Sequence, residues 1–456
     1  MTQRRSSLSR FFSDYGMVLA LLLLCAFFSA VTYSEQHLSG VAAADQLATA
    51  IIKQFGPGAR VLIAARDQPE DAAFAERLRQ RLTSAGASVT EVVKGEPKDA
   101  RAALQRAADS QSKLDAIAGT EATRGWLVFA ELAKDFPSLG NPVLVQPRSY
   151  RWPNFLKREN LLNITNQIAV IAILAVGMTV VIIAGGIDLS VGSLIALAAV
   201  AACLLIRDFA GGANAAAFGL TLSCLAAIAG SGAVGAFTGA VITRFLVPPF
   251  VVTLGVMLMA SGGAYLLAQG QSVYQVPDSF IWLGRGANLF GVPNAVVLML
   301  TLYVAAHVMM SRTRLGRYLY AVGGNLEAAR LSGVPVKRVQ LFAYTLSGLL
   351  AGLGGIVMAS QLKSGSPTYG QMYELYVIAA VVVGGTSLSG GEGKIFGTLI
   401  GAFIIAVIQN GMNLMNVESY TQKVVLGLVI LAAVLLDKLK QGGWRGGRAP
   451  NGTQSA

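Results

Sequence analysis

Hydrophobic residues are grouped in long runs that a single polar stretch interrupts. Ten apolar runs occur, at residues 15–33, 163–184, 191–206, 216–242, 250–268, 294–310, 339–360, 374–386, 395–415 and 420–436. A helix of about 20 predominantly apolar residues is long enough to cross the hydrocarbon core of a bilayer. The pattern therefore predicts an α-helical polytopic membrane protein with about ten transmembrane helices. For the first run, a cleaved signal peptide is the alternative.

Several runs are too short for a straight crossing and adjoin glycine pairs, most clearly run 374–386. Backbone that unwinds at membrane depth is tolerated only where protein buries it or where it lines a cavity. Broken helices on a transport pathway are thus one interpretation, and ordinary turns are the other. Close helix packing is expected at three Gly-x-x-x-Gly pairs: Gly235/Gly239, Gly348/Gly352 and Gly397/Gly401.

The interrupting stretch, residues 35–155, alternates short apolar runs with amphipathic segments. Strands are expected at 60–65, 88–93, 114–119 and 142–146, and helices at 69–84, 97–110 and 121–136. This order predicts a small inserted α/β domain with a parallel sheet. The arrangement looks like one lobe of a periplasmic binding protein. One lobe has no cleft to close, which favours docking or assembly, and a receptor role stays open.

The expected domains follow from these patterns. They are an N-terminal tail with the first transmembrane helix (1–34), the inserted α/β domain (35–155), a transmembrane domain with a basic loop at 311–338 (156–438) and a C-terminal tail (439–456).

The distribution of charged residues along the chain indicates how the chain is oriented in the membrane. The chain has 36 Lys+Arg and 24 Asp+Glu, and charged residues make up 13% of it, about half of the roughly 25% usual for soluble domains. The inserted stretch is nearly neutral, so the net charge of +12 arises mainly in the membrane part. A nucleic-acid partner is therefore not expected, because the retention of basic loops on the inner side of a membrane explains the excess of Lys and Arg over Asp and Glu.

If all ten runs cross, the inner side holds fifteen basic residues and the short outer loops hold four. The inner set is Arg4, Arg5, Arg10, Arg244, Arg312, Arg314, Arg317, Arg330, Lys337, Arg338, Lys394, Lys438, Lys440, Arg445 and Arg448, and the outer set is Arg207, Arg285, Lys363 and Lys423. This asymmetry predicts cytoplasmic N- and C-termini and an extracytoplasmic inserted domain.

Catalytic and metal chemistry find little support in the sequence. The two histidines, His37 and His307, are far apart, and all three cysteines lie in apolar runs, so neither a metal site nor another cofactor is expected. The stretch 388–394 resembles nucleotide-binding motifs of ATP-binding cassette ATPases, but Ile395 stands where Mg²⁺ coordination requires Ser or Thr. The chain is thus expected not to be an enzyme.

Four segments together resemble a known family. They are 173–196 (ILAVGMTVVIIAGGIDLSVGSLIA), 247–255 (VPPFVVTLG), 314–334 (RLGRYLYAVGGNLEAARLSGV) and 383–402 (VGGTSLSGGEGKIFGTLIGA). In this order they are similar to membrane permease subunits of ATP-binding cassette importers for ribose, xylose and galactose, within the branched-chain amino acid and sugar permease superfamily. The resemblance spans about 160–438.

The resemblance implies a multi-pass protein of the bacterial inner (plasma) membrane that works with several partners. These are a cytoplasmic ATP-binding cassette ATPase, a periplasmic sugar-binding protein, a second permease chain in a homodimer or heterodimer, and membrane lipid. In that family, the loop equivalent to 311–338 docks into the ATPase. The alternative is that the arginines of 311–338 serve only to keep this loop on the cytoplasmic side of the membrane. The implied coupling residues are Gly324, Asn325, Glu327, Ala328, Ala329, Arg330, Ser332 and Gly333.

Asp188 is an acidic residue near membrane depth and is therefore a functional candidate. It can cap the following helix, contact substrate hydroxyls or contact the ATPase, and the sequence leaves the three roles open. Uncharged polar residues on apolar helices suit a polyol substrate better than an ion. Each of them can equally form a hydrogen bond to a neighbouring helix instead of lining a pathway. The candidate pathway residues are Asn166, Thr179, Asp188, Ser190, Ser193, Thr253, Gln409 and Asn410.

The expected function is that of a permease subunit that provides the pathway for a ribose-type monosaccharide. A same-fold permease for nucleosides or branched-chain amino acids is the first alternative. A secondary transporter or membrane sensor that uses the inserted domain as a receptor is the second.

Overall fold

The computed structural model describes residues 7–441, with side chains for residues 16–435. Tyr33–Pro153 form one compact unit, the α/β unit, and the segments on either side form the other, the helical unit. The units divide after Thr32 and Pro153, where the sequence led us to expect boundaries after residues 34 and 155. Arg4, Arg5, Arg445 and Arg448 lie outside the described residues.

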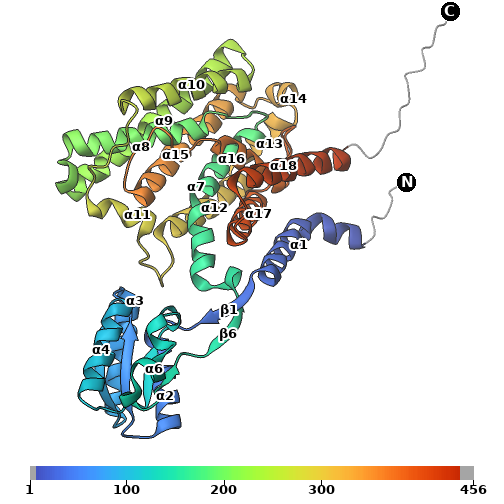
Figure 1. The fold of residues 1–456 in the computed structure, drawn as a ribbon. Helices are drawn as coiled ribbons and strands as arrows, with labels where there is room; N and C mark the ends of the chain where they lie inside the picture. Colours follow the sequence, from blue (N-terminus) through green and yellow to red (C-terminus); the bar gives the residue numbers. More distant parts are fainter. Residues whose placement is uncertain (1–6, 442–456) are drawn as a thin grey trace, which may run out of the picture. The chain divides into compact units, whose positions relative to one another are not determined.

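The helical unit is a bundle of mostly long helices (Figure 1). In chain order these are α1 (Ser7–Val31), α7 (Arg158–Ile183), α8 (Val191–Phe209), α9 (Ala217–Phe245), α10 (Pro249–Leu267), α11 (Trp282–Arg285), α12 (Asn294–Arg312), α13 (Arg314–Gly324), α14 (Leu326–Leu331), α15 (Val336–Leu362), α16 (Tyr373–Val383), α17 (Ile395–Leu414) and α18 (Ser419–Gln441). Among the described residues, seven helices are long and apolar enough to cross a membrane: α7, α8, α9, α10, α12, α15 and α17. Three shorter apolar helical stretches lie at Gly16–Val31, Tyr373–Val383 and Ser419–Leu435. The polytopic helical class is thus confirmed.

Helix α7 forms the centre of the bundle and packs against α12, α15, α16 and α17. Its residues from Ile168 to Ile183 are all buried, as expected for a helix that is apolar on every face. The Tyr303 hydroxyl of α12 donates a hydrogen bond of 3.0 Å to the carbonyl oxygen of Ala172. Even the polar atom of this buried ring is therefore satisfied.

Two of the glycine pairs face each other where α9 crosses α15. A Cβ atom on Gly235 would lie 3.1 Å from the Cα atom of Gly348, and one on Gly352 would lie 3.0 Å from the Cα atom of Ile228. The third pair packs against α16, because a Cβ atom on Gly401 would lie 2.6 Å from the backbone nitrogen of Gly384. The expected packing role of these pairs is confirmed.

We expect Gly348→Val to reduce the yield of folded protein several-fold. The added methyl groups would overlap the backbone of α9, and overpacking of this kind costs about 1–3 kcal/mol or more. Gly255→Val is the matched control, since nothing lies within 4 Å of a Cβ atom at Gly255. Size-exclusion chromatography of detergent-extracted protein measures both, and equal monodisperse yields would refute the packing role.

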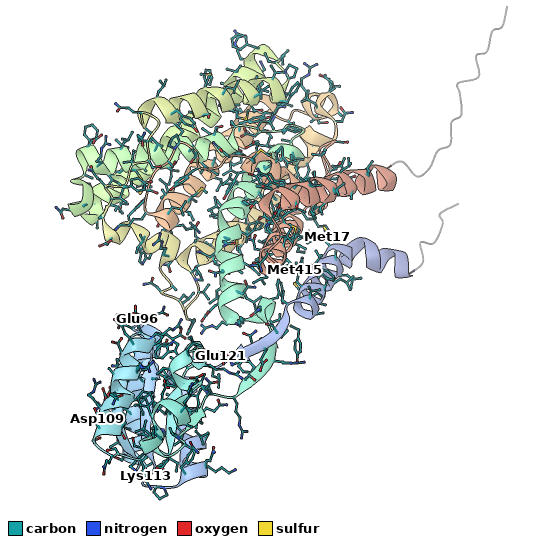
Figure 2. All side chains as sticks on the ribbon, viewed as in Figure 1. Met17, Glu96, Asp109, Lys113, Glu121 and Met415 are labelled. Carbon is teal, nitrogen blue, oxygen red and sulfur yellow. The ribbon has the colours of Figure 1, made fainter. Side chains whose placement is uncertain are left out.

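The α/β unit contains a four-stranded parallel sheet in the order β3-β2-β4-β5. The strands are β2 (Arg60–Ala65), β3 (Ser88–Lys94), β4 (Ala116–Gly119) and β5 (Val143–Val145), all at expected positions. The helices are α2 (Gly40–Phe55), α3 (Pro69–Ser84), α4 (Pro97–Asp109), α5 (Glu121–Arg124) and α6 (Leu132–Asp135). Residues of α2 and α3 and residues of α4 and α6 contribute to two separate cores with the sheet. Glu96 and Asp109, at the two ends of α4, are exposed on the surface of the unit (Figure 2).

The single helix expected at 121–136 was wrong. Gly125 ends α5, and Trp126 is extended, with φ −69° and ψ 118°. This break lets the Trp126 ring stack on Phe129 at a centroid distance of 5.8 Å, against the core. Side-chain packing therefore determines the backbone here more strongly than helix propensity does.

An antiparallel ribbon of β1 (Tyr33–His37) and β6 (Ser149–Pro153) joins the two ends of the α/β unit. A hydrogen bond from the Ser149 side chain holds the pKa of Glu35 below its ordinary value. In the helical unit, the Asn154 N–H donates to the carbonyl oxygen of Thr32 at 2.9 Å, and the Phe155 N–H donates to the Thr32 hydroxyl at 3.1 Å. The polypeptide thus leaves and re-enters the helical unit at adjacent points.

Candidate functional site

Asp188 lies in the turn between α7 and α8 and is 1% exposed. One carboxylate oxygen accepts hydrogen bonds from the Ser190 N–H (3.0 Å) and the Ser190 hydroxyl (2.6 Å). The other accepts from the Ser347 hydroxyl of α15 at 2.7 Å. The helix-capping role considered from sequence would use N–H groups at the start of α8, but one N–H and two hydroxyls bind the carboxylate. The side chain therefore connects this turn to α15.

The end of α13 meets the turn after α7 and the loop after α16, and glycines permit the close approach. The Gly391 N–H donates to the carbonyl oxygen of Ile183 at 2.9 Å, and the Tyr320 hydroxyl donates to the carbonyl oxygen of Gly393 at 2.8 Å. A Cβ atom on Gly323 would overlap the Ile183 carbonyl oxygen and lie 2.6 Å from the Gly391 nitrogen. We call Gly185, Gly323, Gly390 and Gly391 the glycine joint. Displacement of α13 would therefore be transmitted directly to both turns.

The motif Gly-Gly-x-x-Leu-Ser occurs twice, at residues 185–190 and 384–389, and its glycines end α7 and α16 with the same hydrogen-bond pattern. Gly185 and Gly385 have φ values of 84° and 80°, a left-handed conformation that glycine adopts readily. The N–H groups of Gly185 and Gly385 donate three residues back, and those of Gly186 and Thr386 donate five residues back. The two helix ends match only when the motifs are shifted by one residue. Gly185, the first glycine of its motif, corresponds to Gly385, the second glycine of the other motif.

Helices α13 and α14 are short, and side-chain caps begin both. The Thr313 hydroxyl accepts from the Gly316 N–H at 3.2 Å, and the Asn325 side-chain oxygen accepts from the Ala328 N–H at 2.9 Å. Glu327 and Arg330 form an exposed ion pair at 2.8 Å, and Leu331 is 84% exposed. The expected coupling residues therefore form a compact element: Gly324 ends α13, Asn325 caps α14, Ala328 and the buried Ala329 lie within α14, and Ser332 and Gly333 end it.

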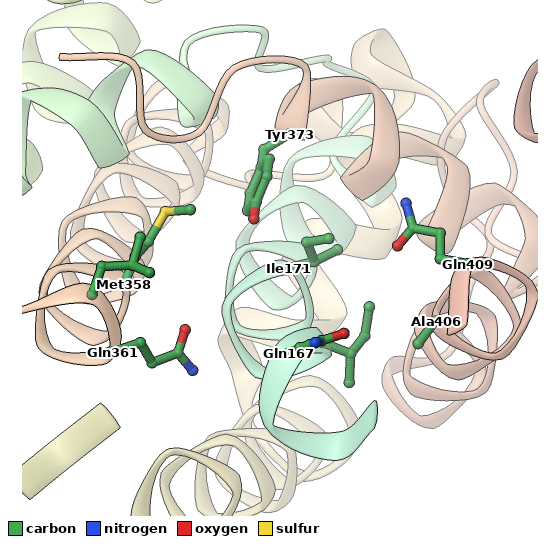
Figure 3. Close-up of a pocket in the computed structure, with 9 residues that line it drawn as sticks. Gln167, Ile171, Met358, Gln361, Tyr373, Ala406 and Gln409 are labelled. Atoms are coloured by element: carbon green, nitrogen blue, oxygen red, sulfur yellow. The ribbon is translucent and has the colours of Figure 1, made fainter. Parts of the chain in front are cut away.

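A cavity of about 270 Å³ lies between α7, α15, α16 and α17 (Figure 3). Its lining residues are Gln167, Ile168, Ile171, Met358, Gln361, Leu362, Tyr373, Ala406 and Gln409. We name it the glutamine pocket, after its three Gln side chains. Of the eight candidate pathway residues, Gln409 alone lines it. The sequence signal for Gln167 and Gln361 was the same as for Gln409, an amide on an otherwise apolar helix.

Most of the other candidates connect neighbouring segments. The Thr179 hydroxyl lies 2.8 Å from that of Thr398 on α17, and Asn410 exchanges two hydrogen bonds with Asn160, at 2.8 and 3.0 Å. The Asn166 amide donates to the Gly284 carbonyl oxygen at 3.3 Å, and the Thr253 hydroxyl donates to that of Ile187 at 3.3 Å. Ser190 binds Asp188, and Ser193 lies in the first turn of α8.

Metal binding has no structural support in the part of the chain that is described. There, His, Cys, Asp and Glu residues form no group of three or more that could hold a metal ion.

A helical bundle with seven membrane-length apolar helices in its described residues, and a pocket between helices that is lined by three amides and a phenol, has the architecture of a multi-pass membrane protein of the transport class. Residues 160–434 match the family described as branched-chain amino acid transport system / permease component, and the chain belongs to this family. It is thus a transport component and not an enzyme.

Named relatives support this assignment. The ribose import permease protein of Escherichia coli is 45% identical over 307 residues, which are 66% of this chain and 92% of the relative. The ribose import permease protein of Bacillus subtilis is 42% identical over 306 residues, which are 67% of this chain and 92% of the relative. The L-arabinose transport system permease protein of Escherichia coli is 38% identical over 293 residues, 63% and 85%. No solved structure gives a significant match.

Proposed function

We propose that the chain is the permease subunit of an ATP-binding cassette importer and carries a ribose-type monosaccharide delivered by a periplasmic binding protein. The observation that carries this proposal is the 45% identity to a ribose import permease over 92% of that protein. The second argument is chemical, because the residues that line the glutamine pocket include no charged side chain. Uncharged amide and hydroxyl groups suit a sugar better than the charged ends of an amino acid.

Sugar uptake tests the proposal directly. Cells that lack their own ribose importers would express this chain with its ATPase and binding protein, and we expect ATP-dependent uptake of labelled ribose. Uptake of leucine or a nucleoside instead of ribose would favour the same-fold alternative. Uptake that persists without any ATPase would favour a secondary transporter.

The proposed membrane arrangement has ten crossings, both termini in the cytoplasm and a second permease chain as partner. The three shorter apolar helices supplement the seven long ones. Helix α16 has 11 residues, so at 1.5 Å per residue it spans only about 16 Å of a hydrocarbon core of about 30 Å. We therefore propose that α16 is half of a broken crossing that protein surrounds and keeps from lipid.

We further propose that α13 and α14 dock onto the cytoplasmic ATPase. The exposed Leu331 supports this role, because a large apolar side chain on a short basic loop suits a protein contact. The glycine joint provides a route from these helices to the turns that follow α7 and α16. The Tyr320 hydroxyl of α13 donates to the Gly393 carbonyl oxygen in the loop after α16. The Gly391 N–H of that loop in turn donates to the Ile183 carbonyl oxygen at the end of α7.

The α/β unit is proposed to lie outside the cytoplasm and to serve in docking or assembly. We expect Ser110→Cys, an exposed position next to α4, to react with an impermeant thiol reagent in cells whose outer membrane alone is permeabilised. Ser332→Cys, exposed after α14, is the matched control and should react only after lysis. The native chain gives the background from Cys25, Cys203 and Cys224. Reaction in the opposite order would reverse the proposed topology.

A further inference from the structure

We propose that the glutamine pocket is a monosaccharide subsite inside a single permease chain, with Gln167, Gln409 and Tyr373 as its specificity-determining residues. This inference rests on the proposed sugar transport and adds a place where one chain alone contacts the sugar. The lining residues all belong to the helical unit, on α7, α15, α16 and α17.

The four helices place the pocket far from the proposed ATPase contact. Helix α15 begins at Val336, five residues after α14 ends, and Gln361 is its penultimate residue. At 1.5 Å per residue, Gln361 lies about 37 Å along the axis from that start. Gln409 lies near the end of α17, and Tyr373 is the first residue of α16. The pocket thus lies at the end of α15 opposite to α13 and α14, where a sugar would arrive from the extracytoplasmic side in the proposed topology.

The polar groups of the pocket retain unused hydrogen-bonding capacity. Within the described residues, the side-chain amides of Gln167 and Gln409 and the hydroxyl of Tyr373 make no hydrogen bond to protein. Figure 3 shows these side chains around one space, although they come from α7, α17 and α16. Gln361 differs, because its amide nitrogen donates to the Asn166 carbonyl oxygen at 3.0 Å and so connects α15 to α7.

These groups match the chemistry of a sugar ring. Each carboxamide offers both a donor and an acceptor, which two adjacent hydroxyl groups can satisfy together, and a phenol offers one of each. The apolar residues Ile168, Ile171 and Met358 can cover the C–H face of the ring. The volume of about 270 Å³ lies just below the range of about 300–1,000 Å³ for ligand pockets, which suits one sugar and not an oligosaccharide.

Equilibrium binding of labelled ribose to the purified permease, without ATPase or binding protein, tests the inference. We expect the native chain to bind ribose, and Gln167→Leu and Gln409→Leu each to weaken binding at least tenfold. Tyr373→Phe, which removes only the hydroxyl, should weaken it several-fold. Gln271→Leu is the matched control, since Gln271 is exposed and does not line the pocket. Size-exclusion profiles would establish that every variant is folded.

The outcomes separate this inference from the proposed function. Ribose binding that the pocket variants weaken and the Gln271 variant does not would support the subsite. Equal binding by all variants, or no binding by the folded native chain, would overturn it, even if the complete importer transports ribose. Pocket-dependent ribose binding without ATP-dependent uptake would support the subsite and overturn the proposed importer.

Discussion

ATP-dependent ribose uptake is expected to fall to background when Glu327–Arg330 are replaced by a Gly/Ser linker. Those residues form most of α14, and glycine costs about 1 kcal/mol per helical position, so the six-residue helix should not form. A flexible linker cannot transmit a rigid displacement to the glycine joint. Uptake is measured in cells, and membrane insertion is measured by the amount of full-length protein in the membrane fraction.

The matched control for the linker keeps the helix and removes only its charges. In the double variant Glu327→Gln, Arg330→Gln, we expect near-native uptake, because exposed ion pairs contribute only about 0–1 kcal/mol. Full uptake by the linker variant would refute a coupling role for α14. Loss of uptake in both variants would instead indicate that the charges themselves contact the ATPase.

Replacement of Asp188 by leucine is expected to lower the yield of folded permease strongly, whereas replacement by asparagine should preserve it. Leucine leaves the Ser190 N–H and the hydroxyls of Ser190 and Ser347 without their acceptor, at about 1–3 kcal/mol for each buried group. Asparagine retains an oxygen for Ser190 and offers an N–H donor to Ser347. Monodisperse protein after detergent extraction gives the yields.

Uptake by the Asp188 variants distinguishes the structural role from substrate binding. If Asp188 binds sugar, both variants should give normal yields and Asp188→Asn should already impair uptake. Asp278→Leu is the control for loss of an acidic residue, because the side chain of Asp278 is 89% exposed and ion paired with Lys363. Equal yields of the leucine and asparagine variants at Asp188 would contradict the structural role.

Local patterns predicted the strands and the helix faces that pack closely well, because an apolar run or a Gly-x-x-x-Gly spacing is itself a feature of neighbouring residues. The run RVLIAA coincides with β2, and the pairs Gly235/Gly239 and Gly348/Gly352 meet at one crossing. The fold of the α/β unit was less predictable where a segment breaks to bury side chains, as around Trp126. Helix α2 and the β1–β6 ribbon were not anticipated, since the pairing of β1 with β6 depends on residues more than 110 positions apart.

The candidate site was less predictable than the fold, because partners across helices decide which polar residue is available. Thr179 is hydrogen bonded to Thr398 and Asn410 to Asn160, whereas Gln409 faces a cavity. All three candidates are polar residues on apolar helices, so the sequence alone does not distinguish them. Tyr373 could not be selected from sequence at all. Its place in the pocket depends on where α16 begins, after a left-handed residue at Met372.

The β1–β6 ribbon also bears on how the chain reaches its native state. Closing a flexible loop costs entropy that grows as about (3/2)RT ln n, and the segment between Thr32 and Asn154 is 121 residues long. Once the α/β unit folds, the ribbon holds the two ends of that segment side by side, so α1 reaches its place against α17 as though a short turn joined it to the start of α7. Prior folding of the α/β unit would therefore lower the entropic cost of docking the first helix onto the rest of the bundle.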